Sequence, residues 1–305
     1  MTRTRRPDSD AIHSSKTFQL PPRDWNPLDA ADDVLLGYGY PRRPNPHTHP
    51  RIAQLWTEVM ARRPDIIRPK SGDPIRPGQK PIRRRQGRDF GVAQYSWGGV
   101  QVDTSASRPA YYISAKWQVP AIWPAAGDPA EEMFAGFWVG LSSGVDDSLL
   151  QAGIYVEVQA DPLSGPPKWS AFTEWYPADS EPIDFEMSTG DLISVVVCAD
   201  SPTTAKAWFY NYGTNKGAPA CPIYAPTNVR LIGSSAVWAA EAGSNELPAF
   251  CPVSFTECIA ATGTQEFNVA EGSTFEIEND TYQQKLTKTS IVSPTTVVID
   301  WVDFS

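Results

Sequence analysis

The chain has 305 residues, 41% of them hydrophobic, which is enough for one large domain or two small ones with a sizeable core. The 29 prolines and 21 glycines imply many turns and argue against a helical bundle. Residues 1–90 hold 18 basic and 10 acidic residues (+8), whereas residues 91–305 hold 8 and 25 (-17), and so acidic a body argues against a nucleic-acid partner.

Residues 1–90 form a basic N-terminal extension in which two helices are predicted. The run DAADDVLL at residues 29–36 predicts a short helix that ends at Gly37. In HPRIAQLWTEVMARRPD, residues 49–65, apolar side chains stand at i, i+3, i+4, i+7 and i+8 counted from Ile52, which is one face of a helix. Residues 64–90 are rich in proline and arginine, a composition typical of a linker.

From about residue 91, short β-branched and aromatic runs alternate with turn signals. Examples are QYSWGGVQV, FAGFWVGL, SLLQAGIYVEV, DLISVVVC and TVVIDWV. About a dozen such runs, with no long helical pattern between them and no internal repeat, predict an antiparallel all-β domain, either a sandwich or a barrel. The chain is therefore expected to divide into the extension, residues 1–90, and a β-rich body, residues 91–305.

The residue types in the body restrict its chemistry. All three histidines, His13, His47 and His49, lie in the extension, so the body lacks the base that a Ser-His-Asp or Cys-His mechanism needs. PHTHP at residues 46–50 is a weak metal-binding set, because no carboxylate or thiolate adjoins it. No phosphate-binding glycine motif occurs. We therefore expect neither a metal nor a cofactor.

The cysteine spacing and the hydropathy of the chain indicate which metal, redox and membrane roles to expect and whether a secretion signal is visible. Cys198, Cys221, Cys251 and Cys258 form no CxxC pair, which argues against a zinc knuckle or a thioredoxin-like site and leaves one or two disulfides open. No stretch approaches the ~18 consecutive apolar residues of a membrane span, so no membrane partner is expected. The basic N-terminus is not followed by an apolar stretch, so no secretion signal is visible.

Two segments set a polar side chain among apolar neighbours. Gln151 lies inside the run LLQAGI, and Glu241 ends the run AVWAAE. Strand alternation places Glu241 and Ala239 on the face opposite Trp238 and Ala240. Each of the two polar residues is either a solvent-facing residue of a strand or a group that points into a cleft.

The order of motifs along the body resembles that of the glutamic peptidases, the eqolisin family. YSWGG resembles the family's opening Trp-small-Gly strand, FWVGL its Trp-Val-Gly-Ile segment, and FTEWYP its Glu-Trp-Tyr-Pro run. LLQAG resembles the segment that carries the catalytic glutamine, and AVWAAEAG the segment that carries the catalytic glutamate. The resemblance covers about residues 91–305. It implies a concanavalin A-like sandwich of two bent sheets and an endopeptidase that acts on polypeptides, favours acidic pH and, we expect, is a monomer.

The resemblance implies a catalytic pair, Gln151 and Glu241. Glu241 would take a proton from the attacking water and return it to the leaving amine, while Gln151 would hold the developing oxyanion. Trp138, Glu174 and Trp97 would line or support the substrate groove. The alternative for these three is that the tryptophans belong to the core and the carboxylate to a buried ion pair.

Two departures from the family pattern keep other functions open. Ser142 and Tyr155 stand where family aspartates are expected, which puts the acid optimum in question. One alternative is a relative that has lost activity. Another is a binding module for carbohydrate or peptide, which would show exposed, coplanar tryptophan faces and no converging Gln–Glu pair. The family is typically secreted, so the resemblance implies secretion although no signal is visible.

The opposite charges of extension and body predict that the extension packs on the body, near the groove. Two interpretations of the extension follow. It is either a pro-segment, released at low pH when body carboxylates are protonated and cut in the tether PIRRRQGR at residues 81–88, or a permanently docked structural lobe.

Overall fold

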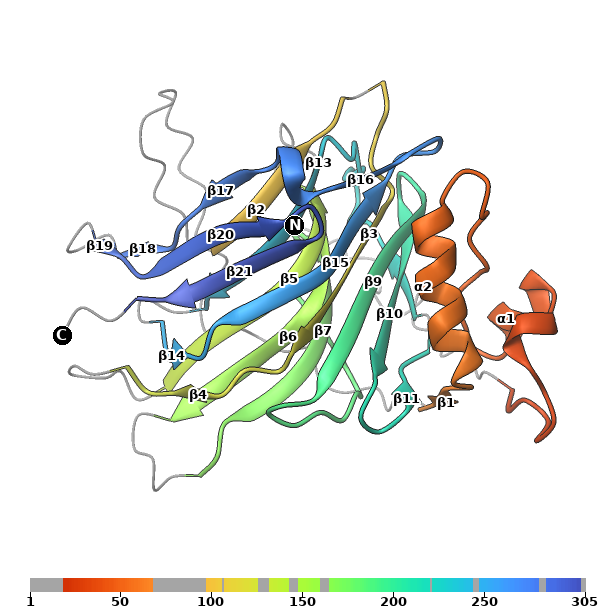
Figure 1. Cartoon of the computed structure of the whole chain (residues 1–305), viewed down its shortest axis with the longest axis horizontal. Coiled ribbons are helices and arrows are strands. Elements are labelled where there is room, and N and C mark those ends of the chain that lie inside the picture. Colours follow the sequence, from red (N-terminus) through yellow and green to blue (C-terminus); the bar gives the residue numbers. More distant parts are fainter. Residues whose placement is uncertain are drawn as a thin grey trace, which may run out of the picture.

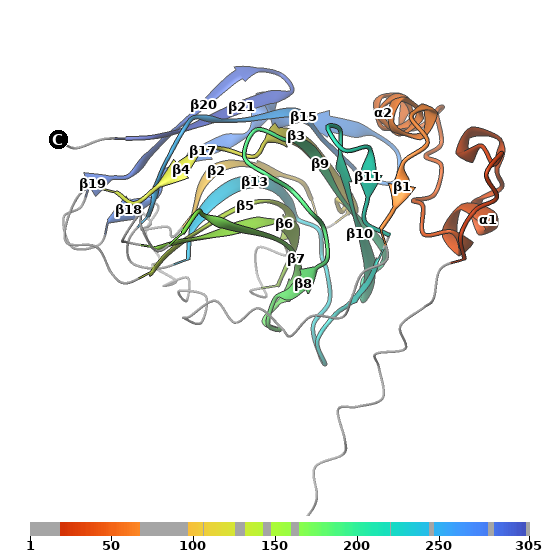
Figure 2. The ribbon, with the colours of Figure 1, turned by 90° about the horizontal axis from the view of Figure 1, so that it is seen from below.

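Two curved β-sheets stacked face to face make up the body, and a small helical lobe lies against the outside of one of them (Figures 1 and 2). The structure is a computed structural model. It describes residues 19–67, 97–105, 107–125, 132–142, 148–159, 165–219, 221–243, 247–279 and 284–302. The predicted all-β sandwich with a small N-terminal helical extension is confirmed.

The first sheet has seven strands in the order β17-β2-β13-β5-β6-β7-β8, and every neighbouring pair is antiparallel. The hollow side of its curve faces away from the second sheet (Figure 2), and we call this side the concave face. The strands are β2 (Trp97–Asp103), β5 (Glu132–Ser142), β6 (Leu149–Gln159), β7 (Lys168–Tyr176), β8 (Glu181–Ile183), β13 (Ser235–Ala242) and β17 (Ser273–Phe275).

The second sheet has ten strands along the path β1-β11-β10-β9-β3-β15-β21-β20, with β12 paired to β10 and β16 to β15. Its pairs are antiparallel except β1 with β11, which is parallel. The strands are β1 (Asp65–Ile66), β3 (Tyr112–Gln118), β9 (Leu192–Ser201), β10 (Thr204–Asn211), β11 (Lys216–Gly217), β12 (Cys221–Tyr224), β15 (Val253–Ala261), β16 (Glu266–Asn268), β20 (Thr287–Ser293) and β21 (Thr296–Trp301).

The remaining elements are short. Two further strand pairs lie outside the main sheets: β4 (Ile122–Trp123) with β14 (Ala249–Phe250), and β18 (Glu278–Asn279) with β19 (Gln284–Lys285). The helices are η1 (Pro27–Asp29), α1 (Asp32–Gly37), α2 (Pro50–Ala61) and η3 (Val269–Glu271).

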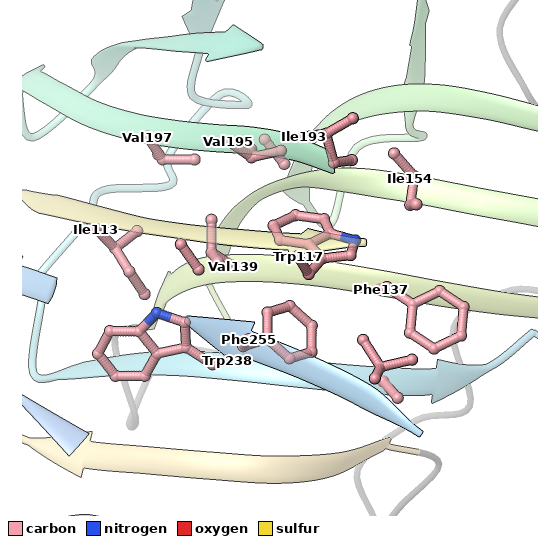
Figure 3. Packing of buried hydrophobic residues seen from close by; sticks show 14 of the residues in the cluster. Ile113, Trp117, Phe137, Val139, Ile154, Ile193, Val195, Val197, Trp238 and Phe255 are labelled. Atoms are coloured by element: carbon pink, nitrogen blue, oxygen red, sulfur yellow. The ribbon is translucent and has the colours of Figure 1, made fainter. Parts of the chain in front are cut away.

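The core lies between the two sheets and follows from strand alternation. Side chains point to opposite faces of a strand in turn, so every second residue of β6 and of β9 enters the same apolar layer. Trp117, Phe137, Trp238 and Phe255 are four of the bulky aromatic members of this layer (Figure 3). Full burial of such a side chain contributes about 1.5–3 kcal/mol. The intervening residues of β5, β6, β7 and β13 are left for the concave face.

Both predicted helices of the extension are present, and α1 ends at Gly37 as expected. The five apolar residues of the predicted stripe in α2 are all buried: Ile52, Leu55, Trp56, Val59 and Met60. They pack on the second sheet, against Trp208 and Tyr210 of β10 and against Ile259 of β15. The expectation that the extension packs on the body is therefore confirmed.

The expected position near the groove is wrong. Trp208 and Tyr210 contact α2, whereas their neighbours Ala207 and Phe209 enter the core, so the lobe covers the outer face of the second sheet. Figure 2 shows α1 and α2 on the far side of this sheet from the concave face. The cause is local, because the aromatic outer face of β10 offers the apolar stripe a matching surface. The tether at residues 81–88 lies outside the described residues, and the pro-segment interpretation stays a prediction.

Body residues cap both ends of α2. Glu266 accepts hydrogen bonds from the backbone N–H groups of Arg51 (3.2 Å) and Ile52 (2.8 Å), and these are orphan donors of the first turn. Asn215 donates to the carbonyl oxygens of Arg62 (3.2 Å) and Arg63 (3.4 Å) at the other end. Arg51 also forms an ion pair with Glu257 at 2.8 Å. These contacts favour the structural-lobe interpretation.

Replacing Glu266 with alanine is expected to lower the free energy of unfolding by about 1 kcal/mol, because the first turn of α2 loses its acceptor and the favourable charge at its N-terminus. Urea unfolding followed by circular dichroism measures the change. The control Glu278→Ala, at a half-buried glutamate of β18, tests loss of a side chain elsewhere. Equal effects of the two substitutions would contradict a capping role for Glu266.

Three of the cysteines are free thiols: Cys198, Cys251 and Cys258. Cys258 lies in the core, where burial raises the pKa of its thiol. No disulfide therefore contributes to the fold through these three residues. Among the described residues, no helix is long and apolar enough to cross a membrane.

Candidate active site

The five site residues expected from the sequence come together on the concave face. Gln151 in β6 is the cross-strand partner of Glu174 in β7, and Glu241 in β13 is that of Trp97 in β2. Trp138 lies on β5, the strand between β6 and β13. All five alternate with core residues along their strands, so their side chains share the face opposite the core.

The Trp138 ring lies along β5 between Gly136 and Gly140, and only at Gly140 would a β-carbon crowd it. A β-carbon on Gly136 would lie 3.5 Å from Trp138 Cδ1 and 3.9 Å from Glu241 Cβ. A β-carbon on Gly140 would lie 3.1 Å from Trp138 Cζ3 and 3.2 Å from Gln151 Cβ. The indole therefore extends along the strand from the side of Glu241 to that of Gln151.

Burial and a hydrogen bond from Trp138 determine the pKa of Glu241. Trp138 Nε1 donates to Glu241 Oε2 at 2.9 Å. Burial raises the pKa of Glu241 to about 7, and the hydrogen bond from Trp138, which favours the carboxylate, opposes only part of this effect. The carboxyl group therefore exchanges its proton near neutral pH.

Glu174 is a second carboxyl group with a raised pKa on this face. Burial and, to a smaller extent, the charge of Glu241 raise its pKa to about 8, although a hydrogen bond from Gln151 opposes part of this rise. The two glutamates are close enough to sense each other's charge, and like charges resist simultaneous ionisation. At neutral pH, Glu174 therefore stays largely protonated beside Glu241.

Gln151 is buried, with only 5% of its surface exposed. Its amide donates a hydrogen bond to Glu174, while its Oε1 has no hydrogen-bond partner among the described residues. An unsatisfied buried oxygen is costly, which favours a water or a substrate N–H at that position. Glu174 thus holds one edge of the amide and leaves the other free.

The aromatic surroundings were only partly foreseen. The Trp97 ring lies 6.0 Å from the Trp138 ring and 5.2 Å from Phe275, and Phe172 packs against this group. Phe172 and Phe275 were not singled out in the sequence. Alternation by two from Glu174 places Phe172 on the concave face, so that signal was available.

Tyr155 and Ser142 occupy the positions where family aspartates were expected. Tyr155 lies on the concave face and pairs with Gly136, whose other neighbour is Glu241. Its hydroxyl bonds to Ser170, and burial raises its pKa. Ser142 ends β5. Neither residue adds a negative charge near Glu241, so a carboxylate there meets less repulsion than it would beside an aspartate.

No metal centre forms among the residues that the structure describes, because no three His, Cys, Asp or Glu side chains are grouped to hold an ion. His49 instead lies buried at the start of α2, where its Nε2 is 2.9 Å from the carbonyl oxygen of Thr262. The weak metal-binding pattern PHTHP therefore has a structural use for one of its histidines.

The raised pKa of Glu174 makes the stability of the protein depend on pH. Its pKa is about 8 in the folded state and 4.5 in its ordinary state, so the folded state binds the proton more tightly than the unfolded state does. The resulting contribution to the free energy of unfolding is fully present below pH 4.5 and is lost as the pH rises through 8. In the variant Glu174→Gln, residue 174 carries an amide that cannot ionise.

Between about pH 5 and pH 8.5 the Tm of the wild type should therefore fall by several degrees more than the Tm of this variant. Thermal unfolding across that range measures the difference, and the exposed-site control Glu271→Gln should follow the wild type. Parallel curves for wild type and Glu174→Gln would contradict the raised pKa.

Comparisons with known proteins agree with this fold. The structure is similar to that of scytalido-glutamic peptidase with a transition state analog inhibitor, at a TM-score of 0.56 and 22% identity over 68% of this chain and 98% of that one. It is also similar to SCP-B, a member of the eqolisin family solved with the tripeptide Ala-Ile-His, at a TM-score of 0.53 and 21% identity with the same coverage. No curated protein matches the chain.

The family model gives the assignment. It is described as the Peptidase A4 family, and it matches residues 95–301, which is more than half of the chain and nearly all of the body. The extension lies outside the match. The same range contains all five residues of the concave face expected from the sequence. The chain is thus a hydrolase of the glutamic endopeptidase type, and it belongs to the Peptidase A4 family.

Proposed function

We propose that this peptidase cleaves polypeptides with Gln151 and Glu241 as its catalytic pair and a water molecule as the nucleophile. The position of the Trp138 ring, beside both Glu241 and Gln151, supports the pair. Its indole nitrogen donates to Glu241, and its ring lies next to Gln151 beside Gly140, so both groups lie on the same face of the sheet. A peptide lying across the concave face would meet the two groups together.

Glu241 is proposed as the general base and then the general acid. Its Oε2 is engaged by Trp138, which leaves Oε1 to take a proton from water as the water attacks the scissile carbonyl. The same oxygen then gives the proton to the leaving amine. A pKa of about 7 suits both steps, because the group neither holds nor releases the proton too strongly near neutral pH.

Gln151 is proposed to hold the oxyanion. Its amide carries two N–H groups, of which one is directed to Glu174 and the other is available for the negative charge that develops on the carbonyl oxygen. One such donor contributes about 3 kcal/mol to transition-state stabilisation in a hydrolase. Glu174 is a positioning residue in this scheme, since it acts through Gln151.

The raised pKa values of Glu241 and Glu174 determine the pH range in which the peptidase should be active. The carboxylate form of Glu241 is lost as the pH falls through about 7, so protonation of the base limits activity on the acid side. Ionisation of Glu174 as the pH rises through about 8 adds a second negative charge beside Glu241. We therefore propose a maximum between about pH 7 and about pH 8. The acidic optimum implied by the family resemblance would require the bound substrate to lower the pKa of Glu241.

The test is digestion of a denatured protein from about pH 3 to about pH 9, with the wild type beside Glu241→Gln. Cleavage by the wild type alone supports the pair, and the acid limb of the rate profile reports the pKa of the base. Cleavage by both proteins would reject Glu241 as the base. No cleavage by the wild type at any pH would support the alternative of an inactive relative.

A sugar-binding module is not favoured. Such a site needs exposed, coplanar aromatic faces, but Trp138 is 1% exposed and its ring is tilted by 59° to that of Trp97. The two rings therefore offer no flat platform for a carbohydrate.

A further inference from the structure

A cavity of about 670 Å³ lies between α2 and the outer face of the second sheet, on the opposite side of the molecule from Gln151 and Glu241. We call it the lobe–sheet cavity. One wall comes from α2 and the loop before it, and the other from β3, β9 and β10. Its volume is within the ~300–1,000 Å³ typical of small-molecule sites.

Most of the cavity lining is apolar. Leu55 and Val59 of α2 line it together with Val196 of β9 and Trp208 of β10. Val196 lines the cavity and is only partly buried, whereas its neighbours Val195 and Val197 point into the core from the other face of β9. A ligand here would bury an apolar body along the length of the helix.

Most charged side chains around the cavity already have a partner, either an opposite charge or a polar or aromatic group. Lys206 pairs with Asp200, and Glu257 pairs with Arg51 at 2.8 Å. Arg43 donates to the carbonyl oxygen of Leu28 at 2.6 Å, and its guanidinium lies over the Trp56 ring. These groups have no strong need for a further partner.

Arg42 is the exception. It is exposed, it lines the cavity, and it makes no hydrogen bond or ion pair with any residue that the structure describes. Its guanidinium is near Cys198 in the wall, where burial raises the pKa of the thiol to about 12 and the charges of Lys206 and Arg42 partly oppose that rise. An unpaired guanidinium at the edge of an apolar cavity favours a ligand with one negative charge.

A second donor lies deeper. Trp208 is 4% exposed, and its Nε1 has no acceptor among the described residues. Trp208 pairs with Val196, two residues along the strand from the Cys198 position that Arg42 approaches. Arg42 and Trp208 both offer N–H donors, so a ligand with acceptor oxygens fits them.

We propose that the lobe–sheet cavity binds an aliphatic monocarboxylate of the fatty-acid class, with its carboxylate at Arg42 and its chain along α2. The unpartnered guanidinium of Arg42 favours an anionic group, the apolar walls favour a hydrocarbon chain, and the two donors, Arg42 and Trp208, favour carboxylate oxygens. The site is separate from the catalytic pair, so a failure of either proposal leaves the other untouched. Because the ligand would contact both lobe and sheet, binding would also stabilise their docking.

The test is calorimetric titration of the whole protein with decanoate at neutral pH, beside 1-decanol as the neutral counterpart. The wild type is expected to bind one decanoate and to bind 1-decanol at least tenfold more weakly, because the alcohol cannot pair with Arg42. Arg42→Gln should raise the Kd for decanoate by about tenfold or more, since a charge-assisted contact is lost. The exposed-site control Arg23→Gln should leave the Kd unchanged.

A second pair of variants tests the position of the chain. Val196→Phe fills the cavity and should abolish binding, whereas the same substitution at Val292, which is 59% exposed on β20, should not. Thermal unfolding checks that each variant is folded, and if Val196→Phe is not, Arg42→Gln decides. The proposal is overturned if the wild type shows no saturable binding, if 1-decanol binds as tightly as decanoate, or if a folded Val196→Phe binds like the wild type.

Discussion

Replacing Glu241 with glutamine is expected to lower kcat for peptide hydrolysis by about 10³-fold or more, because the enzyme loses its general base and acid. The substitution is nearly isosteric. The amide oxygen can still accept the hydrogen bond from Trp138, which is 2.9 Å from the carboxylate in the wild type. The amide cannot take a proton from water, so the loss should be chemical and not structural. Initial rates of cleavage of a denatured protein at the wild-type pH optimum give the measurement.

The control for this variant is Glu271→Gln, which makes the same change at an exposed residue of η3. It should retain the wild-type rate and pH profile. The two variants should have similar far-UV circular dichroism. A folded Glu241→Gln with the wild-type rate would show that the base is another group, and the catalytic pair would then have to be abandoned.

Replacing Gln151 with alanine is expected to lower kcat by about 10²–10³-fold, because the oxyanion loses a positioned donor. KM should change much less, since the donor is needed in the transition state and not for ground-state binding. The variant also leaves Glu174 without its hydrogen-bond partner, so the pKa of Glu174, already raised, should rise further. Steady-state kinetics across the pH range separate these effects.

The control for the second variant is Gln284→Ala at an exposed glutamine of β19. It should match the wild type in both kcat and KM. Glu174→Gln provides an internal comparison, because a positioning residue should cost less than the donor it positions. If Gln151→Ala raised KM and left kcat unchanged, Gln151 would be a substrate-binding residue and not an oxyanion donor.

The elements of the fold were predictable because they depend on local order. Alternation by two marked strands such as β6 and β9, in which every second side chain enters the core. The spacing of Ile52, Leu55 and Trp56 marked α2, because a helix brings these positions onto one face. Neither pattern depends on what the segment packs against, so neither required knowledge of the rest of the chain.

The order of the strands and the place of the lobe were not predictable in this way. In the first sheet β13 lies between β2 and β5, although more than ninety residues separate it from either in the chain. Which surface would bury the stripe of α2 depended on the outer aromatics of β10, Trp208 and Tyr210, which a pattern of alternate apolar residues assigns to no partner. Net charge correctly indicated that the lobe docks on the body, but long-range attraction does not select a face.

The sequence by itself therefore determined the β-rich body, the helical extension and the candidates on the concave face, because periodicity and residue type are local properties. Only the tertiary structure decided that Trp138 lies between Glu241 and Gln151, that Glu174 holds the Gln151 amide, and that burial raises the pKa of both glutamates. The physical reason is that hydrogen bonding and desolvation depend on neighbours brought together from distant parts of the chain.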